Sequence, residues 1–195
     1  MHSLLLESSN NIVFTPNLVV ADGESTDEIT EKAQYYIDEF AMLKHPEGGW
    51  YKETYRDKGV IPASELNDFG GDRSYSTAIY FLLANGNPSV FHRIKADEMW
   101  HFYDGDGIVI HELDESGRYT QHRLGLDIAN GEEPQLVIKG KSWFASEVIK
   151  ENGWCFVGCT VAPGFDFEDF EMAERKTLTE LYPEHSDLIS RLTNS

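Results

Sequence analysis

The chain has 195 residues, of which 41% are hydrophobic, enough to bury one sizeable core but hardly two. It carries 34 acidic residues against 16 Lys and Arg, which gives a formal net charge of −18. This charge repels phosphate backbones and anionic lipid headgroups, so we expect no nucleic-acid partner and no membrane partner.

The start of the chain carries no targeting signal that we can identify. No apolar run approaches the roughly 20 residues that a membrane span needs. The first residues, MHSLLLESSNN, lack the basic start and the small-residue cleavage site of a signal peptide. We therefore expect a cytoplasmic protein.

The first predicted elements are an arm and a helix. Residues 1–25 form the arm, which holds two apolar patches, LLL and NIVFTPNLVV. A helix is predicted over residues 26–44, where Ser25 can cap and Glu28 completes a capping box. Apolar residues recur through it at helical spacing: Ile29, Ala33, Ile37 and Phe40. The helix should end before Pro46.

From about residue 48 to 172 the chain reads as short β-rich runs separated by Gly, Asn and Asp. The predicted strands are GGWYKETYR, RSYSTAIYFLL, NPSVFHRI, EMWHFYDG, GIVIHEL, GRYTQHRLG, PQLVIKG, SWFASEVI, GWCFVGCTV and FDFEDFEM. This spacing favours an antiparallel sandwich or barrel. Residues 173–195 form a C-terminal helical segment, so residues 26–195 are predicted to be a single, mostly β domain.

Two cysteines, Cys155 and Cys159, lie in the predicted strand WCFVGCTV. An extended strand would hold them roughly 13 Å apart. They cannot form a disulfide at that separation, and we expect two buried thiols that pack as small apolar side chains.

The stretch GNPSVFHRIKADEMWHFYDGDG contains the candidate chemistry. Residues 89–94 and 98–103 are predicted strands joined by a tight turn, so His92 should face Glu98 across a hairpin. Strand alternation places Glu98 with Trp100 on one face and His101 on the other. We expect the face with His101 to pack in a dimer interface.

This stretch resembles the first conserved motif of the cupins, G-x5-H-x-H-x3,4-E-x6-G. Gly86, His92, Glu98 and Gly105 fit its spacing, and Ile94 replaces the second histidine. The second motif, G-x5-P-x-G-x2-H-x3-N, fits less well.

In the second motif Gly140 aligns with the central glycine, Ile138 with the proline, Trp143 with the histidine and Glu147 with the asparagine. Two usual cupin metal ligands are then replaced, by Ile94 and by Trp143.

A longer span resembles an uncharacterised cupin family, a domain of unknown function. The resemblance covers residues 43–192 and includes HPEGGWYKETYR, STAIYFLL, FHRIKADEMWHF, SWFA and GCTVAPGFDFEDF. It implies a cupin-type double-stranded jelly-roll β-barrel with flanking helices, a pocket in the barrel mouth and a homodimer. It implies no activity, because cupins include isomerases, epimerases, oxygenases, sugar-binding proteins and storage proteins.

The two ligand replacements favour a drier pocket wall, so we favour no metal cofactor. The alternative is a divalent-metal-dependent cupin enzyme in which His92 and Glu98 bind the metal with ligands from elsewhere. Glu53 and Asp166 are candidates to complete the sphere, although nothing in their spacing obliges either to point inward.

The metal-free interpretation resembles the dTDP-dehydrorhamnose epimerases, which have the same fold and abstract a proton next to a carbonyl with a histidine base. In this chain His92 would be the base and Glu98 would fix its tautomer. Tyr51 and Tyr55, on the face of the strand that carries Glu53, are the candidate general acids.

The remaining candidates are ligand-binding residues: Glu53, Trp100, Trp143 and Asp166. The two tryptophans could stack on a sugar ring. No arginine cluster suits a diphosphate, so a small polar, carbohydrate-like ligand fits the charge better. The sequence leaves open whether the protein is an isomerase or epimerase at all, since a non-catalytic small-molecule-binding or structural cupin remains the second alternative.

Overall fold

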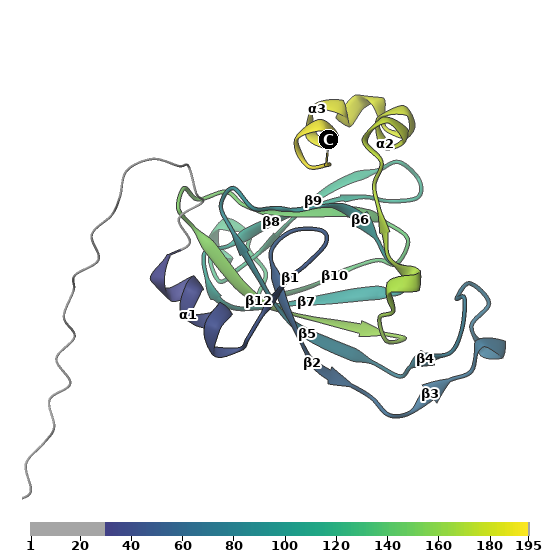
Figure 1. Ribbon diagram of the computed structural model, residues 1–195. Helices are drawn as coiled ribbons and strands as arrows, with labels where there is room; N and C mark the ends of the chain where they lie inside the picture. Colours follow the sequence, from purple (N-terminus) through teal and green to yellow (C-terminus); the bar gives the residue numbers. More distant parts are fainter. Residues whose placement is uncertain (1–29, 195) are drawn as a thin grey trace, which may run out of the picture.

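The computed structural model describes residues 30–194, and two antiparallel sheets that face each other form its centre (Figure 1). The predicted arm and the predicted helix cap at Ser25 lie outside the described residues. The expected mostly β, jelly-roll architecture is confirmed. The sheets are separate, and they are not joined into one hydrogen-bonded cylinder.

The larger sheet has six strands. Their order is β1 (Leu43–Lys44), β2 (Trp50–Arg56), β5 (Thr77–Ala84), β12 (Trp154–Ala162), β7 (Asp97–Gly105) and β10 (Gln135–Ile138). Every neighbouring pair is antiparallel.

The smaller sheet has five strands, also antiparallel. Their order is β13 (Glu171–Met172), β6 (Ser89–Arg93), β11 (Trp143–Val148), β8 (Ile108–Leu113) and β9 (Tyr119–Leu124). A separate ribbon pairs β3 (Val60–Ile61) with β4 (Arg73–Ser74). The consecutive strands β6 and β7 thus belong to different sheets.

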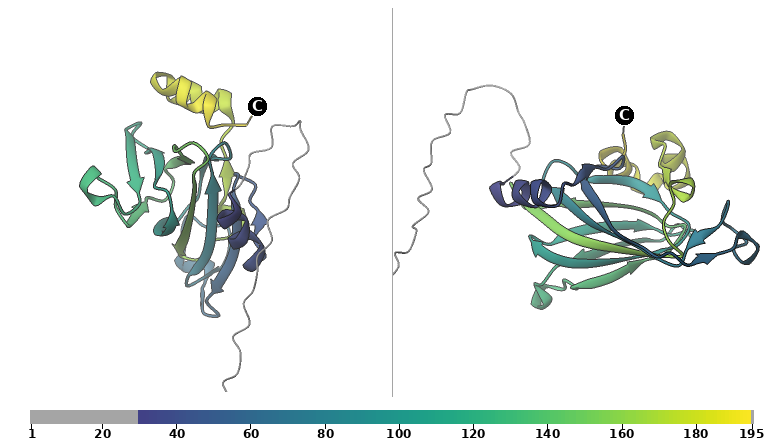
Figure 2. Two further views of the ribbon diagram at one scale, coloured as in Figure 1. Left: turned by 90° about the vertical axis from the view of Figure 1, so that its left-hand side faces the viewer. Right: turned by 60° about the horizontal axis from the view of Figure 1, so that its bottom comes forward.

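Helices cover the outer faces of the sheets. They are α1 (Glu31–Glu39), α2 (Arg175–Leu181) and α3 (Ser186–Arg191). Short 3-10 turns lie in the connections: η1 (Ala63–Glu65), η2 (Ile128–Asn130), η3 (Phe167–Asp169) and η4 (Pro183–His185). Helix α1 packs against the six-stranded sheet and the two C-terminal helices pack against the five-stranded one. In Figure 2 the C-terminal helices, in yellow, are well separated from α1, in purple.

Helix α1 is shorter than predicted. Thr30 is its N-cap, and the hydroxyl oxygen of Thr30 accepts a hydrogen bond from the backbone N–H of Ala33 at 3.3 Å. The helix ends at Glu39 and does not reach residue 44, because Ala41 has a left-handed φ of 48° and Leu43 pairs with β2. No helix within residues 30–194 is long and apolar enough to cross a membrane.

The main core lies between the two sheets. Inward side chains of both sheets form it: Phe81, Leu83, Trp100, Ile108, Ile110, Leu124, Leu136, Ile138, Phe144, Val148, Cys155, Val157 and Cys159. Both cysteines are buried and free, as predicted. Alternation along β7 is also as predicted, since Trp100 joins this core whereas His101 contacts Thr160 on the outer face.

The segment after β12 is mostly not the strand predicted for FDFEDFEM. Asp166 accepts a hydrogen bond from the backbone N–H of Glu168 at 2.9 Å, which starts the turn η3. Only Glu171–Met172 then joins a sheet. A buried ion pair anchors the turn, in which Arg73 contacts Asp169 through Nε at 2.7 Å and through Nη2 at 2.9 Å. This segment therefore forms a compact cover over one end of the core.

Candidate functional site

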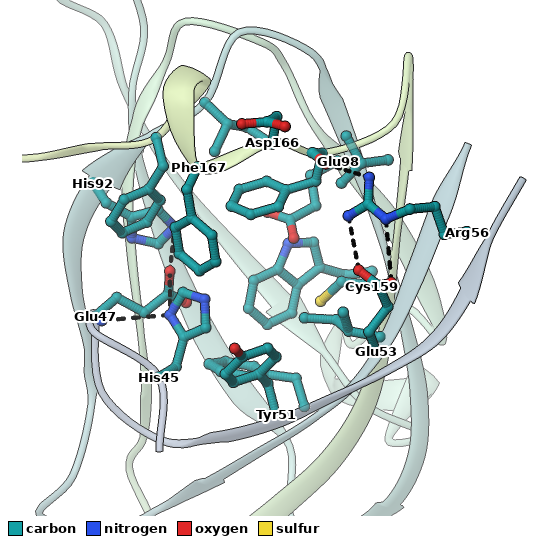
Figure 3. Close-up of a pocket in the computed structure, with 17 residues that line it drawn as sticks. His45, Glu47, Tyr51, Glu53, Arg56, His92, Glu98, Cys159, Asp166 and Phe167 are labelled. Carbon is teal, nitrogen blue, oxygen red and sulfur yellow. Dashed lines mark hydrogen bonds and ion pairs between the residues drawn. The ribbon is translucent and has the colours of Figure 1, made fainter. Parts of the chain in front are cut away.

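A cavity of about 200 Å³ opens between the two sheets. Its walls come from both sheets, from the loop that precedes β2 and from the segment after β12 (Figure 3). Histidine, carboxylate and thiol groups face the same space, among aromatic side chains.

One wall carries a chain of polar contacts centred on Glu47. A carboxylate oxygen of Glu47 lies 3.1 Å from Nε2 of His92 and 3.2 Å from Nδ1 of His45. Its other oxygen accepts a hydrogen bond from the hydroxyl of Ser89 at 2.9 Å. All of these partners except His45 are buried, so the loop before β2 is tied firmly to β6.

The backbone fixes the tautomer of His92. Its Nδ1 lies 2.8 Å from the carbonyl oxygen of Val90, which can only accept, so Nδ1 carries a hydrogen. Burial lowers the pKa of His92, and the negative charge of Glu47 opposes this without cancelling it. With its hydrogen on Nδ1 the neutral imidazole has none on Nε2, so Nε2 and the Glu47 oxygen 3.1 Å away form a hydrogen bond only when a proton lies between them.

For Glu47, the neighbouring groups outweigh the effect of burial on the pKa. Burial acts to raise its pKa, but His92, His45 and Ser89 together outweigh burial and lower the pKa below the ordinary value. Glu47 is thus a carboxylate at neutral pH. It is placed to stabilise an imidazolium as soon as His92 accepts a proton.

Glu98 lies on β7 of the six-stranded sheet, and its pKa is raised instead of lowered. Burial, and then the charge of Glu47, raise the pKa of Glu98 to about 8, while Cys159 and Trp100 act more weakly in the other direction. Glu98 is therefore a neutral acid at pH 7. The hairpin predicted between His92 and Glu98 is wrong, because β6 and β7 do not pair, and the two side chains meet the cavity from different sheets.

The rest of the inner wall is apolar and aromatic. Phe144 packs on the His92 ring, with centroids 4.1 Å apart, and Ile94 is buried beside it. Phe167 and Phe170, in the segment after β12, close the cavity from the side of His45. Water has little access to the imidazole of His92, which is only 2% exposed.

The mouth of the cavity holds an ion pair. Arg56 contacts both carboxylate oxygens of Glu53, at 2.8 and 3.2 Å, and donates to the carbonyl oxygen of Phe165 at 3.1 Å. Asp166 lines the same mouth. The guanidinium of Arg56 is therefore already occupied by carboxylate and carbonyl groups of the chain.

Most of the predicted site residues meet in this cavity: His92, Glu98, Tyr51, Glu53, Trp100 and Asp166. Tyr55 does not. The pairing of β2 with β5 shifts register between Glu53 and Tyr55, and such a bulge turns the following side chains away from their expected face. Tyr55 is 48% exposed and donates its hydroxyl hydrogen to Asp57.

Trp143 also lies outside the cavity. It packs in the outer cluster with the C-terminal helices, and the guanidinium of Arg93 sits 4.3 Å from its ring centroid. Phe144 occupies the inward position that the second motif had placed at Trp143. The two neighbours face opposite sides of β11, because successive side chains of a strand alternate.

Sequence reasoning missed His45 and Glu47. Both belong to HPEGG, a loop without the periodicity that marks a helix or strand. Two consecutive glycines with positive φ, Gly48 at 112° and Gly49 at 69°, turn this loop back toward β6. A histidine and a glutamate directly before a glycine pair were the available signal.

The donor groups do not fit a cupin metal centre. Within residues 30–194 no group of three or more His, Cys, Asp or Glu side chains is arranged to hold a metal ion. Ile94 and Phe144 occupy the positions beside His92, and the neutral form of Glu98 is a poor ligand. His92 and Glu98, the pair predicted for the metal alternative, therefore do not form a site by themselves.

Two facing antiparallel sheets around an interior pocket define a jelly-roll protein of the cupin type. Residues 34–173 match the family described as Cupin superfamily (DUF985), and the chain belongs to this family.

Three relatives cover most of the chain. It is 31% identical to an uncharacterised protein of Saccharomyces cerevisiae over 150 residues, which are 70% of this chain and 72% of the relative. A hypothetical protein from Leishmania major is 32% identical with a TM-score of 0.75, over 84% of this chain and 99% of that one. A protein of Shewanella oneidensis is 36% identical with a TM-score of 0.75, over 83% and 97%. None of these names states an activity.

Proposed function

We propose that the cavity binds a small, carbohydrate-like ligand and catalyses metal-free proton transfer at a carbon next to a carbonyl, as an isomerase or epimerase does. The observation that carries this proposal is that His92, in contact with Glu47 at 3.1 Å, and the carboxyl of Glu98 line one cavity from different sheets. The base and the acid have their pKa values moved in opposite directions by their surroundings, which is the pattern of acid–base sites that work at neutral pH.

Each group has a defined role in the proposed reaction. The Glu47 oxygen that lies 3.1 Å from Nε2 of His92 takes the proton from carbon and passes it to that nitrogen, and the electron pair of the C–H bond moves to the carbonyl oxygen. Glu98 gives its proton to that oxygen, so that an enol forms with no net change in the number of protons. Glu47 stabilises the imidazolium at 3.1 Å. Return of a proton to the neighbouring carbon or to the other face gives the isomer or the epimer, and Tyr51 is a second candidate acid at the cavity wall.

Deuterium exchange tests the proposal. Free aldoses and ketoses of five and six carbons are incubated with the protein in D2O, and loss of the C–H signal next to the carbonyl is followed by NMR. His92→Ala should slow exchange by about 10²–10⁴-fold. His101→Ala is the matched control, because His101 lies on the outer face of β7.

The results separate the alternatives. Equal exchange in the two variants, or exchange that never exceeds the uncatalysed rate, overturns the catalytic proposal. A sugar that raises the melting temperature without any exchange would instead establish a non-catalytic binding protein.

A further inference from the structure

The floor of the cavity contains a polar atom without a partner. Trp100 is 1% exposed and lines the cavity. Its Nε1 is near enough to the carboxyl of Glu98 to act against the rise in the pKa of Glu98, but it completes no hydrogen bond among the described residues. Buried indole N–H groups usually find an acceptor, and a buried donor left unpaired costs free energy. An acceptor that enters the cavity from outside would satisfy it.

Glu98 adds a second donor next to the first. Glu98 and Trp100 project inward from β7 two residues apart, on the same face of one strand. In its protonated form the carboxyl of Glu98 carries an O–H that can donate. Two neighbouring donors on one cavity wall can share an oxygen atom that has two lone pairs, such as a carbonyl oxygen.

The charges around the cavity exclude anionic ligands. Glu47 is a carboxylate, and Glu53 and Asp166 stand at the mouth. The cation of the mouth, Arg56, is held by both oxygens of Glu53. A phosphate or carboxylate would have to displace Glu53 and face the other two carboxylates.

The size of the cavity limits the ligand to a single small ring. A cavity of roughly 150 Å³ holds one benzene molecule, so this cavity of about 200 Å³ accommodates one six-membered ring with a few substituents. The aromatic walls suit the apolar face of such a ring.

We propose that the indole N–H of Trp100 and the carboxyl of Glu98 together bind one oxygen of an uncharged, monosaccharide-sized carbonyl compound. This inference rests on the proposed use of the cavity for a ligand, and it orients that ligand. Its carbonyl oxygen lies at Trp100 and Glu98, and the carbon that exchanges its proton lies toward His92.

The indole N–H signals of the four tryptophans provide a direct test in ¹H–¹⁵N NMR spectra. Trp100→Phe assigns the signal of Trp100, and Trp143→Phe assigns a control tryptophan that is buried on the outer face. D-fructose and D-xylose should move the Trp100 signal downfield and leave the Trp143 signal in place. D-fructose 6-phosphate and tetramethylammonium should move neither.

Three results would overturn the inference. They are a Trp100 signal that no free sugar moves, an equal shift with D-fructose 6-phosphate, or a shift produced by tetramethylammonium, which would indicate an aromatic cage for cations. Two variants of Glu98 separate loss of the donor from loss of folding. Glu98→Gln keeps a donor and should keep the sugar-induced shift. Glu98→Leu removes the donor and should weaken sugar binding at least tenfold. If the Trp100 signal shifts but no deuterium exchange occurs, the ligand assignment stands and the proposed catalysis fails.

Discussion

Nε2 of His92 lies 3.1 Å from a carboxylate oxygen of Glu47, although His92 belongs to β6 of the five-stranded sheet and Glu47 to the loop before β2 of the six-stranded sheet. The other ring nitrogen is held by the carbonyl of Val90. The histidine therefore cannot rotate to another partner without losing both contacts, and its lone pair keeps one direction.

Replacement of Glu47 should change the titration of His92. Glu47→Gln removes the charge that raises the pKa of His92, so this pKa should fall by a further one to three units, as is typical for loss of an opposite charge at this distance. NMR titration of the imidazole C–H signals measures it. Glu112→Gln is the control, because Glu112 pairs with His122 at 2.8 Å instead. An unchanged His92 titration in Glu47→Gln would contradict the assigned role.

The stability of the fold should fall as pH rises toward 8. The pKa of Glu98 is raised from 4.5 to about 8 in the folded state, so its contribution is complete below pH 4.5 and is lost progressively up to pH 8. The lowered pKa of His92 acts in the opposite sense, but only below its ordinary value of 6.5. Between pH 6.5 and 8 the loss due to Glu98 should reach about 2 kcal/mol.

Urea unfolding at pH 6.5 and at pH 8 measures this loss of folding stability. Glu98→Gln cannot titrate and should show a nearly flat profile over the same range, whereas Glu53→Gln, at the half-exposed mouth, should keep the slope of the unmodified protein. A slope that survives in Glu98→Gln would assign the effect to another group.

The exchange reaction should have a bell-shaped pH profile. The rate falls on the acid side as His92 becomes protonated, at a pKa below 6.5, and on the alkaline side above pH 8 as Glu98 loses its proton. Each limb should approach tenfold per pH unit. Glu98→Gln should remove the alkaline limb and leave the acid limb, and an alkaline limb that persists in this variant would contradict the assignment of Glu98 as the acid.

The buried pair of Arg73 and Asp169 should be essential for the cover over the cavity. Asp169→Asn removes the carboxylate that lies closest to the buried guanidinium and leaves only the exposed Glu168, and such losses cost about 3–5 kcal/mol. Because η3 also carries Phe167, the variant should bind D-fructose more weakly. Glu168→Gln should be nearly neutral, since Glu168 reaches Arg73 only at 3.4 Å and is largely exposed. Chemical denaturation and sugar titration compare the two variants.

Elemental analysis of the untagged protein, purified without chelators, should give well below one equivalent of iron, manganese, nickel or zinc. Chelator treatment should leave the melting temperature unchanged, because the described residues assemble no set of three ligands. Stoichiometric metal that disappears in His92→Ala would establish the metal-dependent alternative.

Alternation along a strand was the most successful guide from the sequence. It placed Glu98 and Trp100 inward and His101 outward, because the period of two is a local property of extended chain. It could not tell which strands are neighbours. A short turn between β6 and β7 looked like a hairpin, whereas in a jelly roll the chain crosses there from one sheet to the other.

The remaining errors arose where alternation is interrupted or absent. The bulge after Glu53 reversed the expected face of Tyr55, and on β11 the side chain that faces the interior is Phe144 and not Trp143. His45 and Glu47 lie in a loop, where no periodic pattern indicates direction. Their contact with His92 is a long-range contact that only the assembled fold creates.

The base and the acid of the proposed site lie on different sheets. The distance between them therefore depends on the packing of all the side chains between the two sheets. The spacing of two packed sheets is set by the volumes of the side chains between them. A methylene added or removed at Ile110 or Val157, both buried in that interior, would therefore move His92 relative to Glu98 without touching a ligand. Reactivity in such a protein can be adjusted from its core, while the residues that meet the substrate stay the same.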